Sequence, residues 1–278
     1  MNSLELSLVL GVCSLAAGLL GALTGLGGGV VIVPLLALAF HVDIHYAIGA
    51  SLMSVIATSS GSASAYVREG FSNVRIGMFL EVATTLGALL GAWLATITPT
   101  TGIAIVFGCI LIFSALMSNR RRPAPDPNTP VDPLAVTLRL NSTYPVAGVK
   151  QPYNVRRVPL GFGLMFGAGT LSGLLGIGSG AVKVLAMDEA MQTPFKVSTT
   201  TSNFMIGVTA AASAGIYLSR GYIDPSLVMP VTLGVLAGSL IGAKLLVRTH
   251  TKSLRIIFGF VIAALGVEMI YSGLTGKL

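Results

Sequence analysis

Charged residues are scarce in this sequence. Asp, Glu, Lys and Arg together make up 10% of the 278 residues, whereas 53% are hydrophobic. Soluble domains usually carry about 25% charged residues, so this composition excludes an ordinary soluble enzyme. The long apolar runs instead predict an integral membrane protein whose outer surface faces the lipid bilayer.

Other features are also rare or missing. Cys13 and Cys109 are the only cysteines and lie inside apolar runs, so they are interpreted as small buried hydrophobic residues rather than a disulfide framework. The N-terminus has Glu5 but no basic residue before its apolar run, unlike a cleaved signal peptide; we expect the first segment to be retained.

Nucleotide-binding motifs are absent as well. No GxxxxGK[ST] sequence occurs, and a GxGxxG motif would need glycine at Val30 and Ala181. The chain therefore encodes no ATP-driven machinery, and we expect neither a cofactor nor a catalytic site. The net charge of +7 is interpreted as a topology signal, so no nucleic-acid partner is expected.

What the chain has in abundance is glycine, and the glycines repeat. GLGGGVV at 25–31 recurs as GIGSGAV at 176–182, a shift of 151 residues without a gap. Of the fourteen glycines between Gly18 and Gly108, eight coincide with another glycine after this shift, where chance predicts about two. Both halves therefore need small residues at the same places, as close backbone approach between helices requires.

Ten apolar runs divide equally between the two halves. An odd number of crossings reverses the second repeat, so we predict an all-α integral membrane protein with about ten transmembrane segments in two inverted-topology repeats, residues 1–117 and 159–278. The runs are 5–24, 28–40, 47–66, 76–96 and 102–117, then 159–175, 178–191, 197–218, 226–247 and 254–272.

The basic residues indicate how the chain is oriented. Seven of the seventeen lie in residues 118–157, and four more lie between Lys244 and Arg255. Because basic loops stay inside, both regions are predicted to be cytoplasmic in the cell membrane. The second run of each half is too short to cross the roughly 20-residue hydrocarbon core and is predicted to be a half-helix, broken from its predecessor or folded back as a re-entrant hairpin.

The connection at 118–158 is a separate segment. It begins with the basic and proline-rich sequence NRRRPAPDPNTPVDP, which is not expected to be helical. LAVTLRLNSTYPVAGVKQPYNV follows, and its alternation predicts a short β-hairpin. We interpret the segment as a cytoplasmic linker that is long enough to take part in docking.

The glycine-rich breaks are the candidate binding site. A helix that begins at such a break leaves N–H groups without intrahelical partners, and its positive dipole end favours an anion. Small and hydroxyl residues follow in each half, and Ser51 and Ser202 occupy equivalent positions. Tight helix packing and interhelical hydrogen bonding are the structural alternatives. The predicted substrate-binding residues are Gly27, Gly28, Gly29, Ser51, Gly178, Ser179, Gly180, Lys183, Thr201, Ser202 and Asn203.

Lys183 distinguishes the two halves, because Ile32 occupies the equivalent position. A lysine this deep in a membrane segment costs at least ~2.5–3.5 kcal/mol, so it needs a partner. The favoured interpretation is direct contact with an anionic substrate. The alternative is a structural ion pair with Glu81, Asp188 or Glu189.

Two weaker patterns complete the survey. His41 and His45 flank Asp43, but they lie in a loop without a helical pattern, and no metal site is predicted there. GxxxG recurs at Gly87/Gly91 and Gly238/Gly242, which favours packing within the chain; a homodimer contact remains possible.

These motifs carry a family resemblance. GLGGGVVIVP, the later Gly49-Ala50-Ser51 and the duplicate GIGSGAVKVLAMDEAM with PFKVSTTTSNFMIGVTA together resemble the TauE/SafE family of membrane permeases, which are sulfite exporters in name. The resemblance covers nearly the whole chain apart from the linker. It implies transport of sulfite, a sulfonate or a related small organic anion without nucleotide hydrolysis. Two departures from the duplication, Ser179 for Gly28 and Leu185 for Pro34, imply half-sites that are not equivalent.

The sequence therefore predicts a secondary transporter that moves a small anion across the cytoplasmic membrane by alternating access. The alternatives are an anion channel, or a non-transporting membrane module that acts through its cytoplasmic loop. A channel should show a continuous polar stripe on several helices, whereas the polar clusters here lie at the two breaks.

Overall fold

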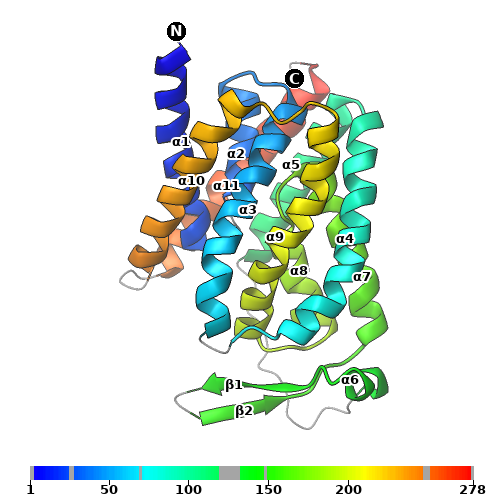
Figure 1. Ribbon diagram of the computed structural model, residues 1–278. Helices are drawn as coiled ribbons and strands as arrows, with labels where there is room; N and C mark the ends of the chain where they lie inside the picture. Colours follow the sequence, from blue (N-terminus) through cyan, green and yellow to red (C-terminus); the bar gives the residue numbers. More distant parts are fainter. Residues whose placement is uncertain are drawn as a thin grey trace.

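Helices make up almost all of the protein in the computed structural model, which describes residues 3–24, 28–68, 71–118, 132–146, 149–246 and 251–276 (Figure 1). Both chain ends lie at one end of the helical body, and a small hairpin covers the opposite end. The all-α class is as predicted.

Corresponding helices occupy corresponding parts of the two halves, and all of them begin and end within three residues of the predicted apolar runs. The first half contains α1 (Ser3–Thr24), α2 (Gly29–Pro34), the π-helical turn η1 (Leu35–Ala39), α3 (Ile44–Arg68), α4 (Val74–Ile97) and α5 (Thr100–Ser118). The second contains α7 (Val158–Leu175), α8 (Gly180–Leu185), the π-helical turn η2 (Ala186–Ala190), α9 (Phe195–Ser219), α10 (Pro225–Leu246) and α11 (Thr251–Leu274).

The packing of one half recurs in the other. Helix α7 packs against α4, and α1 packs against α10. A Cβ on Gly169 of α7 would collide with the carbonyl oxygen of Thr84, and a Cβ on Gly18 of α1 would collide with that of Val235. Both members of the second contact are offset from the first by 151 residues, so the duplicated glycines mark two equivalent helix crossings.

The GxxxG glycines serve the same contacts. A Cβ on Gly87 would collide with the carbonyl oxygen of Phe166, and one on Gly91 with that of Thr170. Gly238 meets Leu15 of α1 in the same way. Glycine at these positions lets two helix backbones approach closely enough for dense van der Waals packing in lipid. The predicted packing within the chain accounts for these three glycines.

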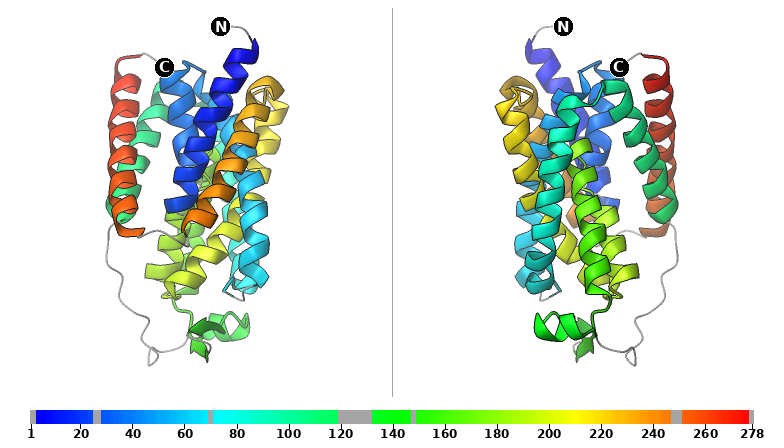
Figure 2. Two further views of the ribbon diagram at one scale, coloured as in Figure 1. Left: turned by 90° about the vertical axis from the view of Figure 1, so that its left-hand side faces the viewer. Right: turned by 90° about the vertical axis from the view of Figure 1, so that its right-hand side faces the viewer.

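Helix directions follow from the same contacts. Residue numbers rise together along the α4–α7 and α1–α10 contacts, so each of these pairs runs in the same direction. Helices α3 and α9 run in opposite directions, because Gly49 lies against Tyr222 whereas Ser59 bonds Asn203. Followed along the chain in Figures 1 and 2, α1 and α7 run in opposite directions, as do α3 and α9.

The short helices α2 and α8 turn back toward the end at which α1 and α7 began. Each continues into a π-helical turn and stops at a residue in the left-handed region, His41 with φ 52° and Gln192 with φ 54°. Pro34 does not cause the first π-helical turn, because Leu185 precedes an identical one. The geometry is therefore that of two re-entrant hairpins.

The described part of the linker is folded and docked. Asp132 caps the short helix α6 (Pro133–Thr137), and its second carboxylate oxygen accepts a hydrogen bond from the N–H of Val158 at 2.9 Å. Strands β1 (Ser142–Val146) and β2 (Val149–Tyr153) pair antiparallel. The predicted hairpin therefore starts only at Ser142: the LAVT segment is helical because Asp132 and Pro133 supply a helix start.

One residue of the membrane part holds this linker. Asn73 caps α4 through the N–H of Ile76 at 3.1 Å, and its amide nitrogen donates to the carbonyl of Leu140 at 2.9 Å and the Tyr153 hydroxyl at 2.7 Å. Burial raises the pKa of Tyr153 to about 12, although the hydrogen bond from Asn73 opposes the shift. The hairpin is thus part of the packed structure.

The outer surface of α4 is apolar. Met78, Val82, Leu86, Leu89 and Trp93 recur at helical spacing and are exposed, whereas Glu81 and Thr84 on the other face are buried. The exposed positions 78, 82, 89 and 90 have apolar counterparts at 229, 233, 240 and 241 of α10 that are also exposed. Within the described residues, α4 and α7 are long and apolar enough to cross a membrane by length and composition.

Candidate functional site

The two glycine-rich breaks meet at Ser51. This buried hydroxyl on α3 donates a hydrogen bond to the carbonyl of Gly176, at the end of α7, at 2.7 Å and lies 3.4 Å from the carbonyl of Gly29. A Cβ on Gly29 would stand 2.7 Å from the Ser51 oxygen and 3.2 Å from the Gly176 oxygen. The start of α2 and the end of α7, 147 positions apart in sequence, are therefore held side by side.

The second break requires glycine for its backbone and for its space. Gly176 and Gly178 have φ values of 67° and 69°, in the left-handed region that residues with a Cβ rarely adopt. A Cβ on Gly178 would also lie 2.8 Å from a methyl of Ile206, and one on Gly180 would lie 2.9 Å from the same side chain. Helix α9 therefore closes over this break.

The equivalent serines make equivalent contacts. The Ser202 hydroxyl donates to the carbonyl of Gly180 at 3.3 Å, as the Ser51 hydroxyl approaches that of Gly29. Ser202 and Ser51 are 1% and 0% exposed. Their positions agree with the repeat, but each hydroxyl is engaged with a helix start in this conformation.

Ser179 is the most unusual residue of the second break. It has φ 44°, although it is not glycine, and it is 2% exposed. Among the described residues its hydroxyl has no hydrogen-bond partner. Gly28, its counterpart, has the ordinary helical φ of −65°. The two breaks thus differ in conformation, as expected from the substitution of Ser179 for Gly28.

Lys183 is completely buried one turn into α8. Its ammonium group donates a hydrogen bond to the hydroxyl of Thr209 on α9 at 2.6 Å. Thr209 in turn donates to a carboxylate oxygen of Glu81 on α4 at 2.7 Å. A cation, a hydroxyl and a carboxylate from three elements therefore form one buried chain, in which the two charged groups lie no more than about 5 Å apart.

The two carboxylate oxygens of Glu81 differ in their hydrogen bonds. Its Oε1 atom also accepts from Thr85 at 3.2 Å, whereas among the described residues Oε2 is buried without a hydrogen-bond partner. The symmetry-related pair of positions carries no charge, because the counterparts of Lys183 and Glu81 are Ile32 and Thr232. One positive and one negative charge therefore occur together at only one of the two equivalent pairs of positions.

The other predicted residues lie around this centre at different distances. Gly27 falls outside the described residues. Gly28 faces α10, where a Cβ would meet a methyl of Val235 at 2.6 Å. Thr201 accepts a hydrogen bond from the N–H of Asn73 at 3.0 Å, and Asn203 offers its carbonyl to Ser59 at 2.6 Å. These two contribute to the crossing of α3 and α9 and to the linker end.

Sequence reasoning left several residues of the site unassigned. Gly176, Ile206 and Thr209 are not among the predicted site residues, and Glu81 is considered from the sequence only as a structural partner of Lys183. One signal could have indicated Glu81: like Lys183, it departs from the repeat by adding a charge at a position where its counterpart has none.

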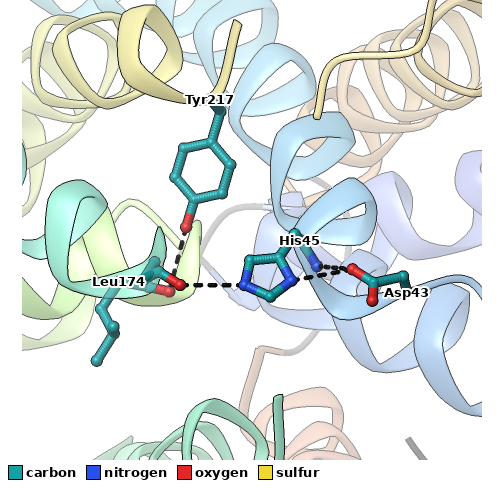
Figure 3. A network of polar contacts seen from close by, with 5 residues as sticks. Asp43, His45, Leu174 and Tyr217 are labelled. Carbon is teal, nitrogen blue, oxygen red and sulfur yellow. Dashed lines mark hydrogen bonds and ion pairs between the residues drawn. The ribbon is translucent and has the colours of Figure 1, made fainter. Parts of the chain in front are cut away.

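A separate polar cluster lies near the start of α3 (Figure 3), which is at the end of the helical body opposite the linker (Figure 1). The Tyr217 hydroxyl of α9 donates to the carbonyl of Gly173 in α7 at 3.2 Å. His45 places one ring nitrogen 3.0 Å from Asp43 and the other 3.0 Å from the carbonyl of Ala95. His45 thus joins the start of α3 to the end of α4.

Among the described residues, no cluster of three or more His, Cys, Asp or Glu side chains could hold a metal ion. His45 is engaged as just described, and His41 lies in the exposed turn before α3.

Comparison with known proteins places this architecture in a family. The family model for the sulfite exporter TauE/SafE matches residues 10–269. The probable membrane transporter protein YunE of Bacillus subtilis is 28% identical over 273 residues, which cover 96% of this chain and 98% of YunE. YdhB of the same organism, also named a probable membrane transporter protein, is 29% identical over 231 residues, covering 82% of this chain and 85% of YdhB.

A more distant relative comes from an archaeon. The probable membrane transporter protein MJ0441 of Methanocaldococcus jannaschii is 22% identical over 267 residues, covering 91% of each chain. No solved structure matches the chain. Since the family model covers both halves and the linker, and the relatives align over most of their length, the chain belongs to the TauE/SafE sulfite exporter family of membrane proteins.

Proposed function

We propose that this protein is a secondary transporter that carries a small sulfur-containing or organic anion across the cytoplasmic membrane by alternating access. Sulfite, sulfonates and related organosulfur acids are the proposed substrates. The family match and the names of the relatives support transport. The proposed sulfur-containing substrates follow from the family name, whereas the binding of a small anion and the mechanism are our inference from the site.

The proposed architecture is a pair of inverted repeats. Corresponding helices run in opposite directions, and the contacts of α1 with α10 recur between α7 and α4. Two similar halves that pack in opposite orientation can exchange their conformations, so a site between them opens first to one side and then to the other. The re-entrant hairpins α1–α2 and α7–α8 bring the two breaks to this interface.

The proposed orientation places the linker in the cytoplasm. The linker supplies Arg139, Lys150, Arg156 and Arg157 at one end of the bundle, whereas both chain ends lie at the other. The positive-inside rule assigns the basic end to the cytoplasm. The His45 and Tyr217 cluster would then lie near the outer end.

The observation that carries the proposal is the completely buried Lys183 beside the two breaks. Ile206 covers Gly178 and Gly180, and Thr209, three residues further along α9, binds the lysine. A cation, several hydroxyl groups and the positive ends of two short helices within one region favour a small anion. Glu81 offsets the charge of Lys183, so the substrate must compete with this carboxylate for the ammonium group.

The membrane potential sets the direction in which an unaccompanied anion moves. With the inside negative, expulsion of each net negative charge is favoured by about 2.3 kcal/mol per 100 mV. Export of an anion needs no coupling ion under these conditions, whereas accumulation does. The direction of transport and the need for a coupling ion therefore depend on whether the anion crosses the membrane with its full negative charge.

A binding assay tests the proposal directly. Purified protein in detergent is melted with sulfite, methanesulfonate, sulfate or acetate, and the shift in melting temperature is recorded for each. We expect at least one sulfur oxyanion to stabilise the wild type but not the Lys183→Met variant, with Ile32→Met as the matched control in the other half. Equal shifts in melting temperature in the wild type and Lys183→Met would show that Lys183 does not bind the substrate.

A further inference from the structure

The buried chain of Lys183, Thr209 and Glu81 constrains the charge of any complex with an anion. Lys183 is 0% exposed, Thr209 0% and Glu81 8%. In this arrangement, one ammonium group and one carboxylate neutralise each other inside the bundle. A monoanion that binds Lys183 adds an uncompensated negative charge at this depth, which is costly in a low-dielectric interior.

The charge can be restored at one place. Thr209 has one hydroxyl proton, which it donates to Glu81 at 2.7 Å while it accepts from Lys183 at 2.6 Å. When an anion takes over the ammonium group, Glu81 loses its countercharge. A proton on the carboxylate then replaces it, and Oε2, which is buried without a hydrogen-bond partner among the described residues, is the atom free to carry that proton.

The neighbouring elements offer few competing groups. Within the described residues α7 carries no titratable side chain, and Arg75 lies exposed at the start of α4. The remaining charged or titratable groups on the elements packed against α4 or α8 lie toward helix ends or on exposed surfaces: Lys196 and Tyr217 on α9, Asp188 and Glu189 on η2, and Cys109 on α5. Lys183 is the cation linked to Glu81.

We propose that Glu81 is the proton-carrying residue of an anion–proton symport in which one proton accompanies each monoanion. This inference rests on the proposed transport function. In the loaded state the anion lies against the Lys183 ammonium and Glu81 is a neutral carboxylic acid. On release the anion and the proton leave to the same side, and the ion pair through Thr209 re-forms. Charge balances throughout: one anion and one proton enter, and the same two leave.

The symmetry-related positions are consistent with this assignment. Ile32 of the first half and Thr232 of the second are the counterparts of Lys183 and Glu81, so both charges are missing together from the equivalent pair. A proton carrier without a cation to release, or a cation without a proton carrier, would leave the interior charged in one state. The paired occurrence is what a coupled site requires.

The test measures proton and anion movement together. Wild-type protein is reconstituted into liposomes containing a pH-sensitive dye, with methanesulfonate and ethanesulfonate as probes because they stay ionised at working pH. An inward sulfonate gradient is expected to acidify the lumen with about one proton per anion. The sulfonate and pH gradients can also be opposed until net sulfonate flux stops. The gradients at that point give the number of protons per sulfonate in the wild type, without any variant.

Glu81→Gln and Glu268→Gln form the matched pair, since Glu268 is an exposed acid on α11. Glu81→Gln is expected to lose all sulfonate-driven acidification and to make net sulfonate flux sensitive to membrane potential, while sulfonate exchange persists. Glu268→Gln is expected to behave as wild type. Sulfonate flux without proton movement in the wild type would overturn the inference of proton symport, and so would unchanged coupling in Glu81→Gln. Neither result would contradict the proposed transport function. Absence of any sulfonate flux in the wild type would overturn the proposed function as well.

Discussion

Replacing Lys183 by methionine should destabilise the unliganded protein, and replacing Glu81 as well should restore most of the loss. Lys183→Met removes the ammonium group but keeps a similar apolar volume. The Glu81 carboxylate then stays buried, bonded to Thr209 and Thr85 but without a countercharge. Glu81→Gln alone strands the ammonium group in the same way.

The structure sets the size of these effects. Charges about 5 Å apart attract by about 3 kcal/mol at an effective dielectric constant of 20. Removing one partner of a buried pair costs about 3–5 kcal/mol, because the other is left uncompensated. The double variant Glu81→Gln/Lys183→Met loses both charges, so we expect its stability to lie within about 1 kcal/mol of wild type. The coupling energy, by which the two single losses together exceed the loss in the double variant, is then at least about 5 kcal/mol.

The assay is unfolding of the four proteins in the same detergent without ligand, followed by melting temperature and by denaturant titration. Ile32→Met is the control, since Ile32 is equally buried at the position of the first half that corresponds to Lys183, and a volume-conserving exchange costs less than about 1.5 kcal/mol. Additive effects of the two substitutions would refute the linkage through Thr209. A Lys183→Met protein that melts higher than wild type would show that the lysine is an uncompensated cation.

Three further predictions concern the contacts that hold the site. Ser51→Ala leaves the Gly176 carbonyl without its buried donor and should cost about 1–3 kcal/mol, whereas Ser60→Ala, at an exposed position on the same helix, should have little effect in the same melt. Asn73→Ala removes the cap of α4 and two buried hydrogen bonds, so we expect a loss of at least about 1 kcal/mol and faster proteolysis of the linker; an unchanged linker would contradict its docking. The raised pKa of Tyr153, about 12, means that the folded protein keeps this proton more tightly than the unfolded chain. Stability from this group is therefore present below pH 10 and lost between pH 10 and 12, by up to roughly 3 kcal/mol, and Tyr153→Phe should abolish that part of the pH dependence of unfolding.

The sequence predicts the helices well because lipid imposes a simple rule. Apolar runs bounded by glycine, proline or charge correspond to the helices, and the glycines that repeat after 151 residues lie at the helix crossings where a Cβ would collide with backbone. The linker is harder to predict from the sequence, since Asp132 and Pro133 start a helix within a segment whose alternation indicates a strand. The helix start decides the structure of the first part of this segment, and the strand pattern decides the rest.

The sequence pattern does not predict which side chains of the site contact each other. Ser51 and Gly176 are 125 positions apart, and Thr209 and Glu81 are 128 apart. Periodicity places each residue on a helix face but does not say which helices face each other. Lys183 is therefore assigned to the substrate from its depth and from the Ile32 at the equivalent position, whereas in the structure its ammonium group is linked to Glu81 through Thr209.

The central claim is that the second glycine break lies at an anion site between the two halves, and uptake into liposomes tests it most directly. Gly178→Ala combines a strained φ of 69° with a contact 2.8 Å from Ile206, whereas Gly221→Ala has a comparable φ of 77° but nothing within 4 Å of its Cβ. The purified wild type and Gly221→Ala are expected to take up sulfite or methanesulfonate with saturation. Gly178→Ala is expected to insert normally and to lose most of this uptake. Full uptake by a well-inserted Gly178→Ala protein would contradict the account.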